Sequence, residues 1–215
     1  MSQTKKLTFM DYQAGNPVDP VVMESMKPYW ADYFGNPGTL HTFGKYPKDA
    51  IEEARTKIAD LIGANRKEEI VFTGGATESN NLAIKGAAFR NKEKGTHIIT
   101  SSVEHMSVLN PIKSLVKFGF KNSSLPTDRY GVVDLDALKK EITNETILVS
   151  VMLANGEIGT VQPIKEISAI LREKSATGKK IFFHMDATAA CGQLPINVQD
   201  LGADLVTLSS NDMYG

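Results

Sequence analysis

Cysteine is almost absent from this chain, since Cys191 is the only one among 215 residues. A single cysteine cannot form an intrachain disulfide, so we expect a reducing compartment, the cytoplasm. Free cysteines are usually small buried hydrophobic residues, and no neighbour in the sequence would lower the pKa of this thiol. We therefore assign Cys191 no catalytic role.

An excess of charge of either sign is also missing. The 24 basic and 25 acidic residues give a net charge of −1, which offers no electrostatic attraction for nucleic acid or an anionic membrane. No apolar run approaches the roughly 20 residues of a membrane helix, and no apolar stretch of a signal peptide follows the first six residues. His41, His97 and His184 do not form metal-ligand spacings with each other or with Cys191. We therefore expect no nucleic-acid, membrane or metal site.

The dominant pattern is an alternation of strands and helices. Residues 1–45 are rich in turn formers and are interpreted as an N-terminal arm with a short helix around 20–32, and a helix follows from about residue 48 to Gly63. Over residues 46–215 further helices are predicted at about 77–89, 107–117, 134–142 and 164–171. Strands are predicted at 70–73, 97–100, 121–125, 147–152, 181–186 and 204–209. This order predicts an α/β domain with a mostly parallel sheet and helices on both faces.

Parallel strands bind ligands beyond their carboxyl ends, so the residues after each predicted strand are the candidates for a site. After the first comes Gly74-Gly75-Ala76-Thr77, where free backbone N–H groups, the positive end of a helix and a hydroxyl would bind an anion. A tight turn with a threonine cap explains the same residues. The residues alone leave both interpretations open.

Four further strand ends carry polar groups, and three of these groups also have a purely structural explanation. His105 could be a packed or solvated side chain, Asn155 precedes a glycine as in ordinary turns, and Asp186 could cap a loop. A buried Asp186 would require a cationic partner. Together with Ser209, these residues suit a flat heteroaromatic phosphate with a protonatable ring nitrogen, which is the description of pyridoxal phosphate.

At these residues the sequence resembles the cysteine desulfurases, class V members of the fold-type I pyridoxal-phosphate enzymes. The resemblance runs from about residue 8 to the end of the sequence. It is carried by these stretches: Asp11-Tyr12, Pro17-Val18-Asp19-Pro20, Phe34-Gly35-Asn36-Pro37, Gly75-Ala76-Thr77-Glu78-Ser79-Asn80-Asn81-Leu82-Ala83-Ile84-Lys85-Gly86, Glu104-His105, Thr146-Ile147-Leu148-Val149-Ser150-Val151-Met152, Asn155-Gly156-Glu157-Ile158-Gly159, His184-Met185-Asp186-Ala187-Thr188 and Tyr214-Gly215.

The resemblance implies a role for each candidate residue. His105 would stack on the pyridine ring, Asp186 would pair with the ring nitrogen, and Asn155 would lie near the phenolic oxygen and the substrate. The phosphate would be bound by three residues: Ala76, Thr77 and Ser209. The family reaction takes sulfur from L-cysteine through a persulfide on a mobile cysteine, and it serves iron–sulfur cluster assembly.

Three positions depart from the family pattern. The lysine that binds the cofactor covalently falls at Asp212, the histidine before it at Asn211, and a glutamine near the phenolic oxygen at Ala189. The persulfide cysteine and the substrate-binding arginine belong to a C-terminal part of the family that has no counterpart in this sequence. We therefore expect weak, non-covalent or absent binding of pyridoxal phosphate and no desulfurase activity of this chain alone, with His105 as the remaining catalytic candidate.

The resemblance also implies an incomplete large domain. In the family fold an antiparallel strand lies between the first and last strands predicted here, and a small domain follows it. A sheet without that strand would leave backbone groups unpaired, so we expect a C-terminal partner chain in a homo- or hetero-oligomer, and an iron–sulfur scaffold protein as a further partner. The alternatives are a non-catalytic scaffold subunit and, less well supported, another class V aminotransferase or lyase.

Overall fold

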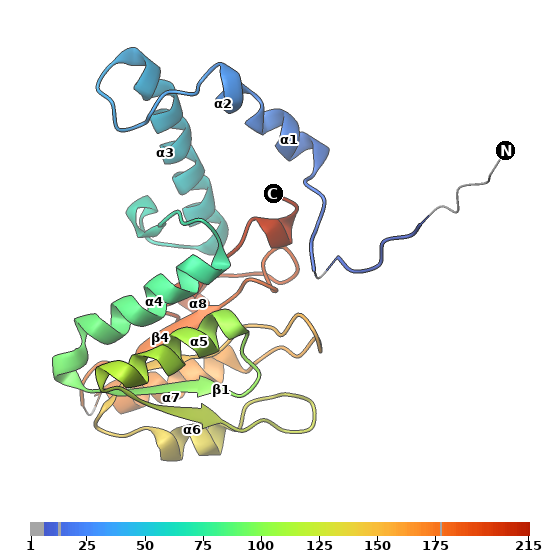
Figure 1. Ribbon diagram of the computed structural model, residues 1–215. Coiled ribbons are helices and arrows are strands. Elements are labelled where there is room, and N and C mark those ends of the chain that lie inside the picture. Colours follow the sequence, from blue (N-terminus) through green and yellow to red (C-terminus); the bar gives the residue numbers. More distant parts are fainter. Residues whose placement is uncertain (1–6, 13, 177) are drawn as a thin grey trace.

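The computed structural model describes residues 7–12, 14–176 and 178–215. Its N-terminal part projects from the remainder as helices α1 (Pro20–Met26), α2 (Pro28–Ala31) and α3 (Thr42–Ile62) (Figure 1). The helix predicted around 20–32 is thus two helices, and each begins with proline, which lacks the N–H that the first helical position leaves unpaired.

Helix α3 starts earlier than the predicted residue 48 and ends, as predicted, at Gly63, which adopts a φ of 68°. A left-handed residue after a helix is the usual place for glycine, because a side chain there would be strained. The proposed division between residues 45 and 46 falls within α3, and the division into arm and domain stays a prediction. No helix in the described part of the chain is long and apolar enough to cross a membrane.

The centre of the molecule is a five-stranded sheet in which every neighbouring pair is parallel, with the order β2-β1-β3-β4-β5. The strands are β1 (His97–Ser101), β2 (Lys121–Leu125), β3 (Thr146–Ser150), β4 (Phe182–Asp186) and β5 (Leu205–Thr207). The prediction of a mostly parallel α/β sheet is confirmed, and five of the six predicted strands are found.

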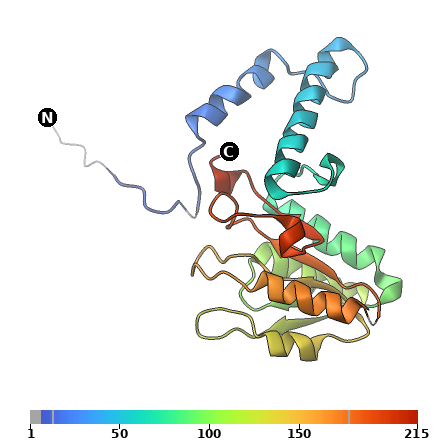
Figure 2. The ribbon, with the colours of Figure 1, turned by 180° about the vertical axis from the view of Figure 1, so that it is seen from behind.

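Helices cover both faces of this sheet, again as predicted (Figures 1 and 2). Ile98 packs into one core with α4 and α5, whereas the next residue, Ile99, packs into a second core with α6 and α7, since successive strand residues point to opposite faces. The helices are α4 (Ala76–Arg90), α5 (Met106–Leu115), α6 (Leu135–Glu141), α7 (Ile164–Ala176) and α8 (Val198–Leu201). Short 3-10 helices are η1 (Lys67–Glu69), η2 (Lys92–Lys94), η3 (Val116–Phe118) and η4 (Asn211–Met213).

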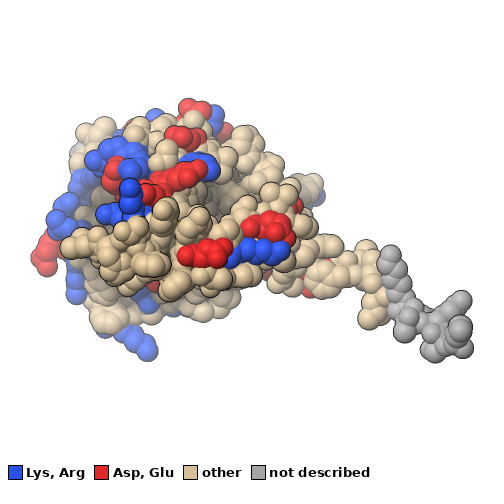
Figure 3. Space-filling model, turned by 90° about the horizontal axis from the view of Figure 1, so that it is seen from above, with Lys and Arg blue, Asp and Glu red and all other residues tan. Residues whose placement is uncertain are grey.

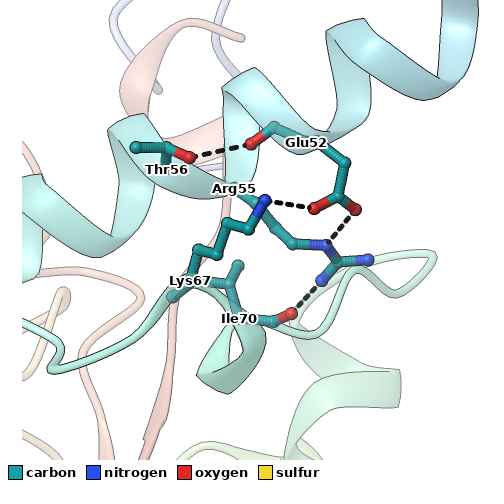
Figure 4. Close-up of polar contacts among 5 residues, drawn as sticks. All are labelled: Glu52, Arg55, Thr56, Lys67 and Ile70. Carbon is teal, nitrogen blue, oxygen red and sulfur yellow. Dashed lines mark hydrogen bonds and ion pairs between the residues drawn. The ribbon is translucent and has the colours of Figure 1, made fainter.

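The prediction of a strand at residues 70–73 is wrong. The segment lies beside α3, where the Arg55 guanidinium donates a hydrogen bond to the Ile70 carbonyl (Figure 4). Arg55 is itself held by Glu52 at 3.3 Å, and Glu52 also pairs with Lys67 at 2.9 Å. A strand requires a neighbouring strand for its backbone groups, and among the described residues none adjoins this segment.

A groove separates this segment from the edge strand β5. Its two parts have volumes of about 690 and 450 Å³, and both are lined by Val71 and Thr73 on one side and by Val206 on the other. Val71 is 63% exposed, and within the described part of the chain β5 pairs only with β4. The apolar pattern that predicted a buried strand is therefore present in a segment that pairs with none of the described strands.

We expect the open edge to be visible in backbone hydrogen exchange. The amides of residues 71–73 should exchange at least about 100-fold faster than those of Leu148 to Ser150 in β3, because only the latter are paired on both sides. Hydrogen–deuterium exchange with mass spectrometry measures both segments in one sample. Equal protection of the two segments would show that residues 70–73 pair as a strand after all.

Candidate functional site

A cavity of about 490 Å³ lies beyond the carboxyl ends of β1, β3 and β4. It brings together five of the six predicted cofactor-binding residues and two of the departing positions: Ala76, Thr77, His105, Asn155, Asp186, Ala189 and Asp212. Ser209 does not line this cavity but the neighbouring groove, together with Gly74, Gly75 and Asn211.

Asp186 ends β4 and is 5% exposed. Its Oδ1 accepts a hydrogen bond from the Thr188 backbone N–H at 3.0 Å, and its Oδ2 accepts one from Nδ2 of Asn80 at 2.8 Å. The expected cationic partner is not found, since none of the described residues forms an ion pair with Asp186. The Asp186 carboxylate is thus bound by two neutral donors, which do not compensate its negative charge.

His105 caps the start of α5. Its Nδ1 accepts a hydrogen bond from the Ser107 backbone N–H at 3.1 Å and lies 2.8 Å from Ser107 Oγ. That hydroxyl oxygen also accepts from Nδ2 of Asn80 at 2.8 Å. The ring that the resemblance places on the cofactor is thus linked to Asp186 through two buried side chains.

The predicted anion site is formed by the first turn of α4, which starts at Ala76 after Gly75. The positive φ of Gly75, 148°, strains any other residue. The N–H groups of Ala76 and Thr77 have no acceptor within the helix and are available to an anion. The Gly74 N–H, in contrast, donates to the Glu78 carboxylate at 2.6 Å, so it is not free for a ligand.

The amide nitrogen and the amide oxygen of Asn155 both form hydrogen bonds that hold the loop after β3. Its Nδ2 donates to the Val103 carbonyl at 3.0 Å, and its Oδ1 accepts from the N–H groups of Glu157 at 2.9 Å and Ile158 at 3.1 Å. The turn interpretation therefore describes what this side chain does within the protein. Its contact with a cofactor stays a prediction.

Glu104 is a buried carboxyl group in the wall of the cavity, with an exposure of 6%. Burial raises its pKa to about 8, although the Ser101 hydroxyl and the Met152 N–H act in the opposite direction, and the charge of Asp186 raises the pKa further. Its Oε1 accepts from Ser101 Oγ at 2.6 Å and from the Met152 N–H at 2.9 Å. Glu104 is therefore mostly neutral at pH 7 and joins the ends of β1 and β3.

The remaining charge in the cavity is negative. Three carboxyl groups besides Glu104 line it, from Glu157, Asp186 and Asp212, and no lysine or arginine is found among the described residues of its wall. Asp212 lies in η4, and the following Tyr214 adopts a φ of 62°, which is uncommon for a residue with a side chain. The Asp19 N–H donates to the Tyr214 carbonyl at 2.8 Å, so the N-terminal arm holds this loop.

Cys191 is buried, as predicted, and packs outside the cavity. Its thiol donates to the sulfur of Met213 at 3.0 Å, and burial raises the pKa of the thiol above its usual value. A raised pKa reduces the thiolate population, which is the reactive form. No group of three or more metal-ligating side chains is assembled in the part of the chain that the structure describes.

The fold and the cavity define a class: a parallel α/β domain with a polar ligand site at the carboxyl ends of its strands. The model of the aminotransferase class-V family matches residues 8–215, and the chain belongs to this family. It is 51% identical to cysteine desulfurase IscS 1 of Archaeoglobus fulgidus over 209 residues, which are 97% of this chain and 53% of that protein. It is 50% identical to cysteine desulfurase IscS of Dictyoglomus turgidum over 211 residues, 98% of this chain and 52% of that protein.

Solved structures give the same assignment of fold. The chain matches SspA in complex with cysteine with a TM-score of 0.91 and 41% identity, over 97% of this chain and 58% of that one. It matches a NifS-like protein with a TM-score of 0.91 and 36% identity, over 95% of this chain and 55% of that one. The sheet is therefore that of the fold-type I pyridoxal-phosphate transferases, and the chain spans about half the length of the curated relatives it matches.

Sequence reasoning missed two residues of this site, Asn80 and Ser107. Asn80 follows Ala76 by four positions, which places both on the same face of α4, and it lies within a stretch that carries the resemblance. That spacing could have identified it. Ser107 gives no comparable signal, because its role depends on a contact with Asn80 across 27 positions of the sequence.

The raised pKa of Glu104 predicts a pH-dependent stability. The folded chain keeps the proton of Glu104 up to about pH 8, whereas the unfolded chain loses it above about pH 4.5. The contribution of Glu104 to the free energy of unfolding therefore falls between about pH 4.5 and pH 8 and is constant above pH 8. His184 acts oppositely: burial lowers its pKa to about 4, so its contribution falls as the pH drops below about 6.5. Between about pH 6.5 and 8, the contribution of Glu104 to the free energy of unfolding therefore changes with pH, whereas that of His184 does not.

Glu104→Gln keeps a carbonyl oxygen for the Ser101 and Met152 donors and removes the titration. In that pH window its free energy of unfolding should rise relative to the parent chain by at most about 1.4 kcal/mol per pH unit. Urea unfolding at several pH values measures the difference. Glu157→Gln, at an exposed carboxyl group of the same cavity, serves as the matched control. A constant difference between Glu104→Gln and the parent chain would contradict the assignment.

Proposed function

We propose that this chain is the cofactor-binding part of a cysteine desulfurase-like protein, which serves sulfur mobilisation and iron–sulfur cluster assembly and is inactive on its own. The observation that carries the proposal is the buried carboxylate of Asp186, which lies without a cation among the described residues in a cavity shared with His105 and Thr77. A protonated pyridine nitrogen would supply the missing positive charge.

The residues of the cavity fit pyridoxal phosphate in most respects. A volume of about 490 Å³ is within the usual range of a small-molecule site. Asp186 would hold the ring nitrogen, His105 would lie against the ring, and Thr77 with the first turn of α4 would bind the phosphate. When bound, the cofactor supplies an electron sink for reactions at an amino-acid α-carbon.

Two features argue against tight or covalent binding. Asp212 stands where the resemblance implies a lysine, and none of the described residues that line this cavity carries an amine for the cofactor. Its charge would also repel a phosphate, by roughly 4 kcal/mol for unit charges 4 Å apart at an effective dielectric near 20. We therefore infer weak, non-covalent binding and no turnover by this chain alone.

The second candidate is a non-catalytic scaffold or interaction subunit that kept the fold and lost the chemistry. It is favoured by Asp212, by Ala189 in the cavity wall, and by Asn211, which lines the neighbouring groove instead of the cavity. Retention of Asp186 and His105 in one cavity favours the first candidate, because a scaffold has no need of a buried carboxylate without a cation.

We also propose that a further polypeptide segment completes the sheet by adding a strand between residues 70–73 and β5. The groove there supports this proposal, since it has an extended apolar segment on one side and the unpaired edge of β5 on the other. Added strands pair their backbone with such an edge and place alternate side chains against its apolar face. Acidic and basic residues both lie on the face seen in Figure 3. The groove itself is lined mostly by uncharged residues, so apolar and backbone contacts would carry the association.

Replacing Asp212 tests the cofactor proposal. Asp212→Lys should bind pyridoxal phosphate covalently at residue 212, giving an adduct that borohydride reduction preserves for peptide mass spectrometry. Asp212→Asn removes only the charge and should bind the cofactor at least about ten-fold more tightly than the parent chain without an adduct. Absorbance after gel filtration measures retained cofactor. The proposal fails if neither variant retains more cofactor than the parent chain.

A charge in the groove tests the added strand. Val71→Glu should abolish association of the chain with itself or with a co-purifying polypeptide, because the buried carboxylate would have no partner. Val116→Glu, an exposed apolar position in η3 outside the groove, is the control and should leave association unchanged. Light scattering after size exclusion gives the mass of each species. A parent chain that is a cooperatively folding monomer would exclude completion by another chain.

A further inference from the structure

A continuous chain of hydrogen bonds connects Asp186 to His105, and both of these residues and Ser107 line the cavity. Nδ2 of Asn80 donates both of its hydrogens, to Asp186 Oδ2 at 2.8 Å and to Ser107 Oγ at 2.8 Å. Ser107 Oγ lies 2.8 Å from His105 Nδ1, which also accepts from the Ser107 N–H at 3.1 Å. Asn80 is fully buried and Ser107 nearly so, which removes water as a competing partner.

The groups at the two ends of this chain fix its direction. A carboxylate only accepts hydrogen bonds, so the NH₂ of Asn80, and not its oxygen, must face Asp186. At the other end, a backbone N–H only donates, so Nδ1 of His105 must be without a proton. The Ser107 hydroxyl accepts from Asn80 and has its own hydrogen free for Nδ1. The neutral ring then carries its proton on Nε2.

This arrangement has a cost that packing alone does not explain. With Nδ2 turned toward Asp186, the Oδ1 of Asn80 is buried and has no hydrogen-bond partner among the described residues. A leucine of similar size would fill the same space without an unpaired acceptor. The NH₂ group of Asn80 is therefore matched to the two acceptors beside it, at the expense of the amide oxygen.

We propose that Asn80 is a positioning residue: it orients the Asp186 carboxylate and, through Ser107, favours the Nε2–H form of His105. The ring then has a single donor, Nε2–H, available to a group bound in the cavity. The amide of Asn80 thereby orients both side chains that the resemblance assigns to the cofactor ring: Asp186 at the ring nitrogen and His105 at the ring face. The consequence for cofactor binding rests on the function proposed above, whereas the state of the histidine ring does not.

Long-range proton–nitrogen NMR of the ¹⁵N-histidine-labelled chain tests the proposal without any cofactor. The spectrum is recorded at mildly alkaline pH, where an ordinary histidine is neutral. The His105 signals are those that disappear in His105→Gln. They should report Nδ1 without and Nε2 with a proton. A His105 ring that carries its proton mainly on Nδ1 in the parent chain would overturn the proposal.

The variant Asn80→Leu isolates the contribution of the amide. It releases the Ser107 hydroxyl to accept from Nδ1–H, so the ratio of Nε2–H to Nδ1–H should fall about three-fold or more. Ser107→Ala should act in the same direction and serves if Asn80→Leu does not fold. Asn81→Leu is the matched control, since the neighbouring amide of Asn81 donates to the Thr77 carbonyl of its own helix, at 2.9 Å. A ratio that none of these variants changes would refute the role of Asn80.

Cofactor binding provides the second readout. Asn80→Leu should weaken retention of pyridoxal phosphate about ten-fold relative to Asn81→Leu, in the parent chain and in Asp212→Asn, because Asp186 loses a donor that fixes its carboxylate. Equal retention by the two variants would contradict the positioning of Asp186. If no variant binds the cofactor, the proposed function fails. The NMR measurement of which His105 nitrogen carries the proton still tests whether Asn80 positions the ring.

Discussion

The burial of one uncompensated carboxylate, that of Asp186, is the constraint on which the site depends. A buried carboxylate requires donors, and the protein supplies neutral ones from Asn80 and the Thr188 backbone. This contact ties β4 to α4 and, through Ser107, to the start of α5. The neutral state of Glu104 belongs to the same pattern, because the nearby charge of Asp186 adds to the burial that raises its pKa. No lysine or arginine is found among the described residues of the cavity wall, and a bound pyridinium would provide a positive charge.

The second constraint is the pairing of strands. Within the described residues β5 has a partner on one side only, and residues 70–73 are held by Arg55 and α3 instead of by a neighbouring strand. The groove between them also borders Ser209, which the resemblance assigns to phosphate binding, and Asn211, one of the three positions that depart from the family pattern. The proposed completion of the sheet and the proposed phosphate site would thus involve the same segment, residues 209–212, in which Asp212 lines the cavity.

Most of the fold could be predicted because it is encoded locally. The buried β3 and the alternation of strands and helices are visible as periodic patterns, and so are the residues that follow each strand. The strand at 70–73 was mispredicted because its apolar pattern is right while its existence depends on a distant partner. The hydrogen bond from Asn80 to Asp186 and the one from Asn155 to the Val103 carbonyl join residues that are 106 and 52 positions apart in the sequence. A local pattern contains no information about them.

A calorimetric titration of the chain with pyridoxal phosphate tests the central claim most directly, when it is run in parallel on the parent chain and on Asp186→Ala. We predict saturable binding of one cofactor per chain, weak because of Asp212, and its loss in Asp186→Ala, since the ring nitrogen then has no counter-charge. Binding of equal strength to both chains would contradict the role of Asp186. Absence of binding to the parent chain would leave the scaffold as the better description of this protein.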